Sequence, residues 1–303
     1  MKAIIDLGTN TFHLLIAEHD GKYIKTYSNI QVPVKLGAGG INKGFMTDEA
    51  MNRGYKALSL FCEEMKKFGW PEHLAFATSA IRNASNGEEF IHKAKTDYGI
   101  TIKKLTGDDE ATAIFNGVRL SFEFPDTPVL VMDIGGGSVE FIIGNSSGIL
   151  WKQSFEIGAA RLMEKFHHHD PITEEETFKL ISYISSVLSP LKEAVKKYEP
   201  FIFVGSAGSF ETFREVALAE LGLSERKLSE YAFLFQRNQL QRFHDLIIQS
   251  DRAQRSNLKG MAEFRVEMIV VATLLMKWVV DEFGFEEIIT SYYALKEGML
   301  VGL

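Results

Sequence analysis

The segment VLVMDIGGGSVEF at residues 129–141 places three glycines between two apolar runs and brackets them with Asp133 and Glu140. A plain β-hairpin needs one or two turn residues, commonly Asn-Gly or Asp-Gly, and no flanking acid pair. Consecutive glycines expose a row of backbone N–H groups and let a ligand approach the main chain closely. Bare amides beside two acids suit a phosphate that carries a divalent cation. The segment therefore predicts a strand–loop–strand unit that binds phosphate.

The same pattern occurs near the start of the chain. AIIDLGTNTFHLLIA (3–17) aligns with LVMDIGGGSVEFIIG (130–144) at a constant offset of 127, which matches Asp6 to Asp133 and Thr11 to Ser138. Both copies read as strand, acid, glycine-containing turn, hydroxyl and strand. An internal repeat of this kind predicts two similar structural units. We expect the two hairpins, one in each half of the chain, to face each other across a cleft and hold a phosphate from both sides.

Length and composition limit the classes of protein to which the chain can belong. It has 303 residues, enough for two domains, with 46% hydrophobic and 24% charged residues, a balance typical of soluble globular proteins. The net charge of −7 argues against binding DNA through a general basic field. One cysteine cannot form an internal disulfide, no apolar run approaches 18 residues, and no leader pattern precedes the first strand. These features predict a cytoplasmic protein with no membrane segment.

Strands and helices are expected to alternate along the chain, which predicts an α/β fold. Strands are expected at 3–8, 12–18, 22–30, 74–78, 101–105, 129–133, 139–144, 149–155, 201–205 and 287–290. Helices are expected from Thr47–Asp48, at 86–98, 108–122, 157–167 and 173–198, from Ser209, and from Ala294, with a mainly helical last third. The restart at residue 129 divides the chain into two similar halves.

Other segments offer chemistry whose role the spacing leaves open. Arg82 follows a buried strand and precedes a helix start, so its guanidinium suits either a terminal phosphate or a surface ion pair. Asp108, Asp109 and Glu110 open a helix, where acids commonly serve capping; one of them could act as general base on a water molecule. FVGSAGSFETF (203–213) is a third strand–glycine–helix turn, a weak anion-binding signal through Gly205 and Gly208.

Taken together, these segments resemble the exopolyphosphatase/guanosine pentaphosphate phosphohydrolase family of the actin-like ATPase superfamily, over nearly the whole chain. The motifs that carry the resemblance follow the family's order: AIIDLGTNTFHLLIA, LGAGGINKG, ATSAIRNASNGEEFI, LTGDDEATAIFNGV, VMDIGGGSVEF, GSAGSF and ALKEGML. The resemblance implies two ribonuclease-H-like domains with a phosphate pocket in the cleft between them. We expect the first domain to span residues 1–121, completed by a helix at about 292–303, and the second to span 122–291.

The resemblance also implies roles for individual residues. Glu110 matches the family's catalytic base, Asp133 and Glu140 its metal-associated acids, and Arg82 its phosphate-holding arginine. The remaining phosphate-binding candidates are Asn10, Thr11, Gly135, Gly136, Gly137, Ser138, Gly205 and Gly208. Three positions depart from the family pattern: Lys296 stands where arginine is usual, Ala207 replaces a glycine, and VVATLL (270–275) lacks a glycine.

The two phosphate-binding hairpins and the family resemblance together imply an exopolyphosphatase. Such an enzyme would use Mg²⁺ or another divalent cation to hydrolyse the terminal phosphate of inorganic polyphosphate. A phosphorylated guanine nucleotide, pppGpp, is an alternative substrate. An actin-like ATP-binding kinase or ATPase and a non-catalytic polyphosphate or alarmone sensor are alternative functions. A homodimer is also considered, because apolar residues such as Phe233, Leu234 and Phe235 could form a contact between two copies if exposed, although burial in the core explains them equally well.

Overall fold

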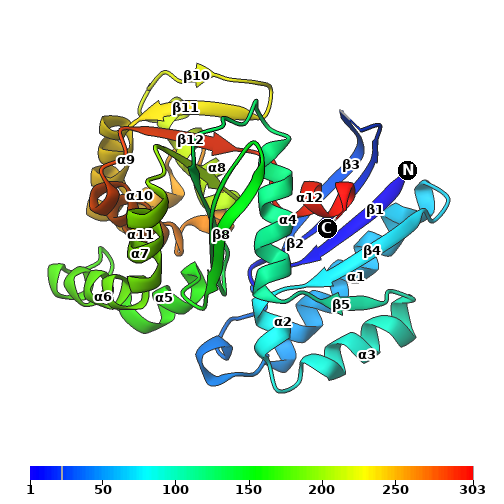
Figure 1. The fold of residues 1–303 in the computed structure, drawn as a ribbon. Coiled ribbons are helices and arrows are strands. Elements are labelled where there is room, and N and C mark those ends of the chain that lie inside the picture. The colour runs from blue at the N-terminus through cyan, green and yellow to red at the C-terminus, as the bar shows by residue number, and fades with distance from the viewer. Residues whose placement is uncertain (22, 303) are drawn as a thin grey trace.

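The computed structural model describes residues 1–21 and 23–302 and contains two mixed β-sheets flanked by helices (Figure 1). Lys22, expected to begin a strand, and Leu303, expected to end the last helix, lie outside the described residues. Among the described residues, no helix combines the length and apolar character needed to cross a membrane. The two sheets form two actin-like domains, which confirms the α/β class.

The first sheet has the strand order β3-β2-β1-β4-β5. Its strands are β1 (Lys2–Leu7), β2 (Thr11–His19), β3 (Ile24–Pro33), β4 (Glu72–Ala77) and β5 (Ile102–Lys104). β1, β2 and β3 pair antiparallel, whereas β4 is parallel to β1 and β5 to β4. The accompanying helices are η1 (Ile41–Lys43), α1 (Asp48–Lys67), α2 (Ser79–Asn83), α3 (Gly87–Tyr98) and α4 (Gly107–Arg119).

The second sheet repeats this arrangement and extends it, in the order β10-β11-β12-β9-β6-β7-β8. Its strands are β6 (Val129–Ile134), β7 (Val139–Asn145), β8 (Gly148–Phe155), β9 (Ile202–Ser206), β10 (Arg226–Lys227), β11 (Ala232–Gln236) and β12 (Glu287–Ser291). As β1 does with β2 and β4, β6 pairs antiparallel with β7 and parallel with β9. The 127-residue repeat is therefore a structural repeat.

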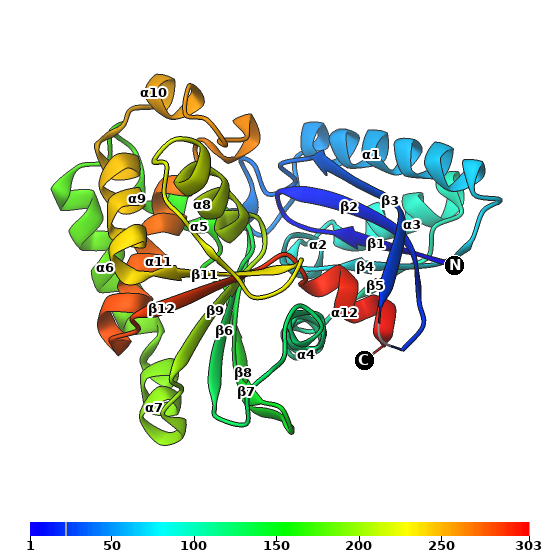
Figure 2. The same ribbon diagram turned by 90° about the horizontal axis from the view of Figure 1, so that it is seen from above.

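Helices between residues 159 and 283 gather on one face of the second sheet, where six of them contribute to one buried cluster (Figure 2). They are α5 (Ala159–Phe166), α6 (Glu174–Val187), α7 (Ser189–Tyr198), α8 (Gly208–Ala219), α9 (Arg237–Gln249), α10 (Arg252–Ser256), η2 (Glu263–Arg265) and α11 (Ile269–Phe283). The helix expected at 173–198 is two helices, α6 and α7. Pro190, in the first turn of α7, explains the break, because proline has no N–H to continue a preceding helix but is favourable at a helix start.

The last helix, α12 (Leu295–Val301), lies with α4 between the two sheets (Figure 2). The two helices approach closely because both carry glycine at the crossing. A Cβ at Gly117 would lie 1.9 Å from the Ala294 carbonyl oxygen, and one at Gly298 would lie 1.7 Å from the Ala113 carbonyl oxygen. Their apolar faces join side chains from both sheets in one buried cluster. The C-terminal helix α12 thus holds α4 in place between the domains.

Of the two interpretations of the segment 233–235, burial in the core is correct and exposure is wrong. Phe233, Leu234 and Phe235 form the middle of β11, which lies between β10 and β12, and they are at most 6% exposed. Their two faces pack into two different cores. They therefore cannot supply the dimer contact for which they were considered.

Candidate active site

Each sheet contains a central hairpin whose two strands are joined by one tight turn. The two turns have the same hydrogen bond. The amide of Gly8 donates to the Thr11 carbonyl at 3.1 Å, and the amide of Gly135 donates to the Ser138 carbonyl at 3.1 Å. These are the residue pairs that the sequence repeat aligns. The hairpins of the two domains thus end in equivalent turns.

The first turn of α5 orients the glycine loop that we define as residues 135–138. Amides of residues 158, 159 and 160 donate to the carbonyls of Gly137, Gly135 and Gly136 at 3.2, 2.9 and 2.8 Å. The C=O and N–H of a trans peptide point in opposite directions. The amides of Gly136, Gly137 and Ser138 therefore point away from α5, and within the described residues they have no hydrogen-bond acceptor. The loop presents a row of free donors.

The N-terminal turn is held by the segment that follows β3. The Asn10 carbonyl accepts from the amides of Val34 and Lys35, both at 2.8 Å, and the Thr9 carbonyl accepts from Gly37 at 3.2 Å. By the same geometry, the amides of Asn10 and Thr11 point away from that segment. The Thr9 hydroxyl and the Asn10 amide nitrogen are buried and lack a partner. Unpartnered buried polar atoms are rare in folded proteins, and a ligand is one explanation for them.

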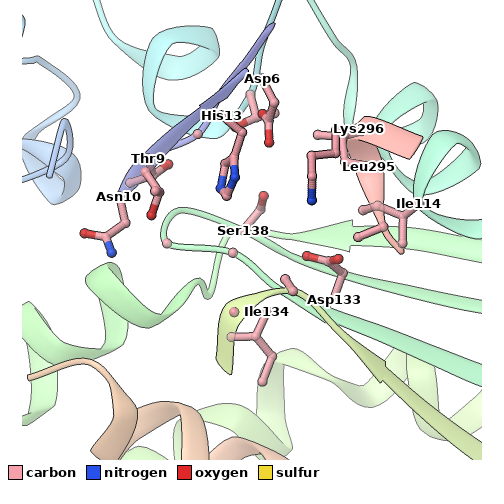
Figure 3. Close-up of a pocket in the computed structure, with 18 of the residues that line it drawn as sticks. Asp6, Thr9, Asn10, His13, Ile114, Asp133, Ile134, Ser138, Leu295 and Lys296 are labelled. Atoms are coloured by element: carbon pink, nitrogen blue, oxygen red, sulfur yellow. The ribbon is translucent and has the colours of Figure 1, made fainter. Parts of the chain in front are cut away.

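The two turns face each other and line one pocket of about 110 Å³ (Figure 3). A Cβ at Gly136 would lie 3.0 Å from the Thr9 Cβ, and one at Gly137 would lie 2.6 Å from the Thr9 hydroxyl. The glycine triplet is thus required by the close approach of the opposite turn as well as by exposure of the amides. The pocket has room for a phosphate-sized group.

Four carboxylates line this pocket: Asp6, Glu110, Asp133 and Glu211. Asp6 is the penultimate residue of β1, and Asp133 lies at the equivalent position in β6. Burial, with the nearby Glu110, raises the pKa of Asp6 to about 8, and burial raises the pKa of Asp133 to about 6. One carboxylate oxygen of Asp6 is buried without a partner, whereas Asp133 accepts a hydrogen bond from Ser206 at 2.7 Å. The raised pKa values show that ionisation of these acids is costly in the absence of further positive charge, which a bound cation would supply.

Glu140 is the cross-strand neighbour of Asp133, as the sequence predicted, but it is not among the lining residues. It is 1% exposed and accepts a hydrogen bond from the Ser154 hydroxyl at 2.6 Å. Burial, together with Glu110 and Asp133, raises its pKa well above the ordinary value. In this structure Glu140 lies beside Asp133 on the neighbouring strand, outside the lining of the pocket.

Glu110 lies in the first turn of α4, after the N-cap Thr106. Of the three acids at this helix start, Asp108 and Asp109 do not line the pocket. Glu110 forms an ion pair with Arg82, with Oε2 2.7 Å from Nη1. Burial outweighs this pairing and raises the pKa of Glu110 to about 7. A carboxylate with that pKa can both accept and release a proton near neutral pH.

Arg82 lies in α2 and is also absent from the pocket lining. Its guanidinium donates to Glu110, to the Leu105 carbonyl at 3.1 Å and to Glu156 at 3.1 Å. The role of Arg82 as a phosphate ligand remains a prediction. In this structure its contacts orient the carboxylate of Glu110.

Two cations that the sequence did not assign to the site also line the pocket. Lys296, at the start of α12, extends toward the space between Asp6 and Asp133 (Figure 3), and Arg265 is at the end of η2. Burial lowers the pKa of Lys296, but Glu297 and Glu211 outweigh that effect and raise it, so the side chain is charged. Lys296 could have been found from the sequence, because it departs from the family pattern, whereas nothing in the sequence marked Arg265 as a site residue.

The third turn, between β9 and α8, reaches the pocket through Ala207 and Gly208. Gly208 allows Arg265 to pack against the main chain, because a Cβ there would lie 1.7 Å from Nη2 of Arg265. Gly205 is not a lining residue; a Cβ there would meet the ring of Phe210 at 2.1 Å, so its glycine serves packing. Ala207 has φ 66° and ψ 176°, a conformation that strongly favours glycine.

The acidic pocket fits a hard divalent cation. Within residues 1–21 and 23–302, no three carboxylate, imidazole or thiol groups are arranged to hold one ion. Mg²⁺ commonly needs only one or two protein carboxylates, with water and substrate phosphate supplying its other ligands. The unpartnered oxygen of Asp6 and the carboxylate of Asp133 meet that requirement.

Two α/β domains whose mirrored turns line one pocket define the class as a two-domain, actin-like fold. The chain belongs to the Ppx/GppA phosphatase family, whose profile matches residues 15–303. An exopolyphosphatase from Cytophaga hutchinsonii is 38% identical, with a TM-score of 0.94 and coverage of 100% of this chain and 98% of that one. An Aquifex aeolicus member of the Ppx/GppA family is 25% identical, with a TM-score of 0.78 and coverage of 99% and 96%.

Proposed function

We propose that this protein is an exopolyphosphatase that hydrolyses the terminal phosphate of inorganic polyphosphate. The observation that carries the proposal is the shared pocket, which both mirrored turns line together with Glu110, and at which amides of the glycine loop lack an acceptor within the described residues. The kinship to the Cytophaga hutchinsonii exopolyphosphatase supports polyphosphate as the substrate.

The residues of the chain suggest how the reaction proceeds. The free amides of the two turns, from Asn10 and Thr11 and from residues 136–138, hold the oxygens of the terminal phosphate. Glu110, ionised and oriented by Arg82, takes the proton of a water molecule as the water oxygen bonds to the terminal phosphorus. The bond from that phosphorus to the bridging oxygen breaks, and the shortened chain leaves with the bonding electrons. Lys296 and Arg265 offset negative charge on the phosphates.

Mg²⁺ or another divalent cation, held by Asp133 and Asp6, would neutralise charge on the phosphate oxygens when bound. We propose that Glu140 positions Asp133 from the neighbouring strand; its role as a metal-associated acid remains a prediction. Both turns and both acids of the repeat thereby take part in the same site.

The test is phosphate release from polyphosphate by the wild-type protein with Mg²⁺ and by Glu110→Gln. We expect kcat to fall by about 10²- to 10⁴-fold in the variant, the range typical for loss of a general base. Asp108→Asn is the matched control, because Asp108 lies in the same helical turn, does not line the pocket and has a 73% exposed side chain. Equal rates for wild type and Glu110→Gln would remove Glu110 from this role.

A second candidate substrate, pppGpp, is favoured by a separate observation. A cavity of about 590 Å³ adjoins the phosphate pocket and shares Thr9 and Asn10 with it. Its cations are paired with acids, Lys35 with Glu267 at 3.2 Å and Arg255 with Asp170 at 2.8 Å. The lining also includes the apolar residues Ile41, Ala160, Met163 and Met268, and the histidines at 167–169.

A charge-balanced, partly apolar cavity suits an uncharged base and sugar better than further phosphates. The comparison that decides is kcat/KM for pppGpp against polyphosphate, measured with the same preparation. A higher value for pppGpp, reduced selectively by Met163→Glu, would make the nucleotide the preferred substrate. A higher value for polyphosphate that is unaffected by this change would support the first candidate.

A further inference from the structure

Glu156, in the loop after β8, bridges the two domains with both carboxylate oxygens. Oε2 accepts from the Ser79 hydroxyl at 2.6 Å and from Arg161 Nη2 at 3.0 Å, and Oε1 accepts from Arg82 Nη2 at 3.1 Å. Ser79 and Arg82 belong to α2, beside the first sheet, whereas Arg161 belongs to α5, beside the second. One carboxylate thus joins elements that are far apart in the sequence.

Arg161 extends this connection to the glycine loop. Its Nε donates to the Gly137 carbonyl at 2.8 Å, and its Nη1 donates to the carbonyl of Ile41, in η1 of the first domain, at 2.8 Å. The Arg161 side chain is 15% exposed, so these bonds are largely shielded from water. A forked guanidinium can satisfy several acceptors at fixed relative positions, which a lysine cannot do.

A continuous chain of contacts therefore runs from Glu110 through Arg82, Glu156 and Arg161 to the Gly137 carbonyl. It alternates two acids with two arginines, so its charges balance. Its two ends are the base and the loop that presents amides to phosphate. The distance between these two groups must be held to a fraction of an ångström for an in-line reaction.

We propose that Glu156 and Arg161 form an interdomain latch, a pair of positioning residues that fixes the glycine loop of the second domain relative to Glu110 of the first. The inference rests on the proposed function, because Glu110 is the base in that reaction. Neither latch residue lines the phosphate pocket. Their loss should therefore affect turnover more than substrate binding.

A double-mutant cycle with Glu156→Gln, Arg161→Gln and the double variant tests the latch. We expect each single change to lower kcat by about 10- to 100-fold, as small misplacements of reacting groups do, with KM changed less than about threefold. The double variant should be no worse than the poorer single variant, because residues acting as one unit are non-additive. Arg161→Lys, which keeps the charge and loses the fork, should not restore kcat.

The control is Arg119→Gln. Arg119 is also half-buried and also donates to a carbonyl outside its helix, that of Ser146 at the β7–β8 turn, but it contacts neither the loop nor the base. This variant should keep wild-type kcat. Folded protein is quantified for every variant, so that kcat refers to folded enzyme and a loss of stability alone does not lower it.

Amide hydrogen exchange of residues 158–160, which donate hydrogen bonds to the carbonyls of the glycine loop, provides a measurement that needs no activity. We expect the latch variants to exchange at least about threefold faster in this segment, and Arg119→Gln to match wild type. An inactive wild-type protein would refute the proposed function, and exchange alone would then decide the latch. If the wild-type protein is active, an unchanged kcat in the latch variants, or additive effects in the double variant, would overturn the latch whatever the exchange rates show. If the wild-type protein is inactive, unchanged exchange rates in the latch variants would overturn it.

Discussion

Asp6 is the residue at which the charge of the site can be measured most directly. Its carboxyl has a pKa of about 8 because it is buried near Glu110, so without a cation it is mostly protonated below that pH. A divalent cation must displace this proton, and metal affinity should therefore fall as pH falls.

We predict that Mg²⁺ binds about 10- to 100-fold more weakly at pH 6.5 than at pH 8.5, since affinity changes up to tenfold per pH unit for each proton displaced. Calorimetric titration at the two pH values, in buffers of different ionisation enthalpy, measures both the affinity and the proton released. Asp6→Asn should bind more weakly at pH 8.5 and show a smaller pH dependence. Equal affinity at both pH values in the unmodified protein would contradict the account.

Ala207 is strained, and its strain leads to a prediction about stability. Its φ of 66° and ψ of 176° lie in a region that costs non-glycine residues about 1–3 kcal/mol. Ala207→Gly should raise the free energy of unfolding by about 1 kcal/mol, after allowance for the greater freedom of glycine in the unfolded chain.

Chemical denaturation of Ala207→Gly measures this change. Ala219→Gly, at the exposed end of α8, is the matched control and should lower stability by up to about 1 kcal/mol, because alanine there has helical geometry. If the two substitutions changed stability in the same direction, the strain at Ala207 would not be real.

At the scale of single elements, α6 is stabilised at its start by a capping box. The side chain of Thr173 accepts from the Glu176 amide, and Glu176 accepts from the Thr173 amide at 3.0 Å. Glu176 also accepts from the amides of His168 and His169, at 3.0 and 3.2 Å. Burial raises the pKa of Glu176, but these hydrogen bonds outweigh it and lower the pKa to about 2.

Because the folded-state pKa of Glu176 is depressed, its contribution to stability is full above about pH 5 and is lost as pH falls toward 2. We predict that Glu176→Gln lowers the free energy of unfolding by about 2–3 kcal/mol at pH 7, and by about half as much at pH 3. Urea unfolding at both pH values measures the difference. Glu175→Gln, an exposed neighbour, should change little at either pH; a pH-independent loss for Glu176→Gln would argue against the cap.

Several elements were predictable because their signals are local. Thr47 caps α1 at the expected position, and the hairpin repeat was visible because each copy carries its own acid and glycine turn. The break before Pro190 was missed because apolar periodicity continues across it, and β11 was missed because a short buried strand resembles a helix segment in sequence.

At the scale of the whole molecule, the location of α12 determines how the domains divide. It packs on α4, β1 and β2 although it follows the second sheet in sequence. We propose that the first domain comprises residues 1–121 and this returning helix, and the second comprises 122–291. The arrangement brings Lys296 of α12 to the acids at the ends of β1 and β6.

The parts of the site that the sequence did not predict depend on this long-range arrangement. Lys296 and Arg265 meet Asp6 and Asp133 only because both sheets present the same strand ends to one cleft. The contact of Arg82 with Glu156 joins residues 74 positions apart, across domains. The spacing of residues along the chain does not predict such long-range contacts, whereas it does predict the turns and acids of the repeat.

The central claim is that the two mirrored turns hold one phosphate between them. The most direct measurement is a crystal structure of the protein with Mg²⁺ and a non-hydrolysable polyphosphate analogue. The account predicts the terminal phosphate within hydrogen-bond distance of amides from both residues 9–11 and 136–138, with Glu110 beside it. A terminal phosphate bound outside this pocket, or contacted by one turn alone, would contradict it.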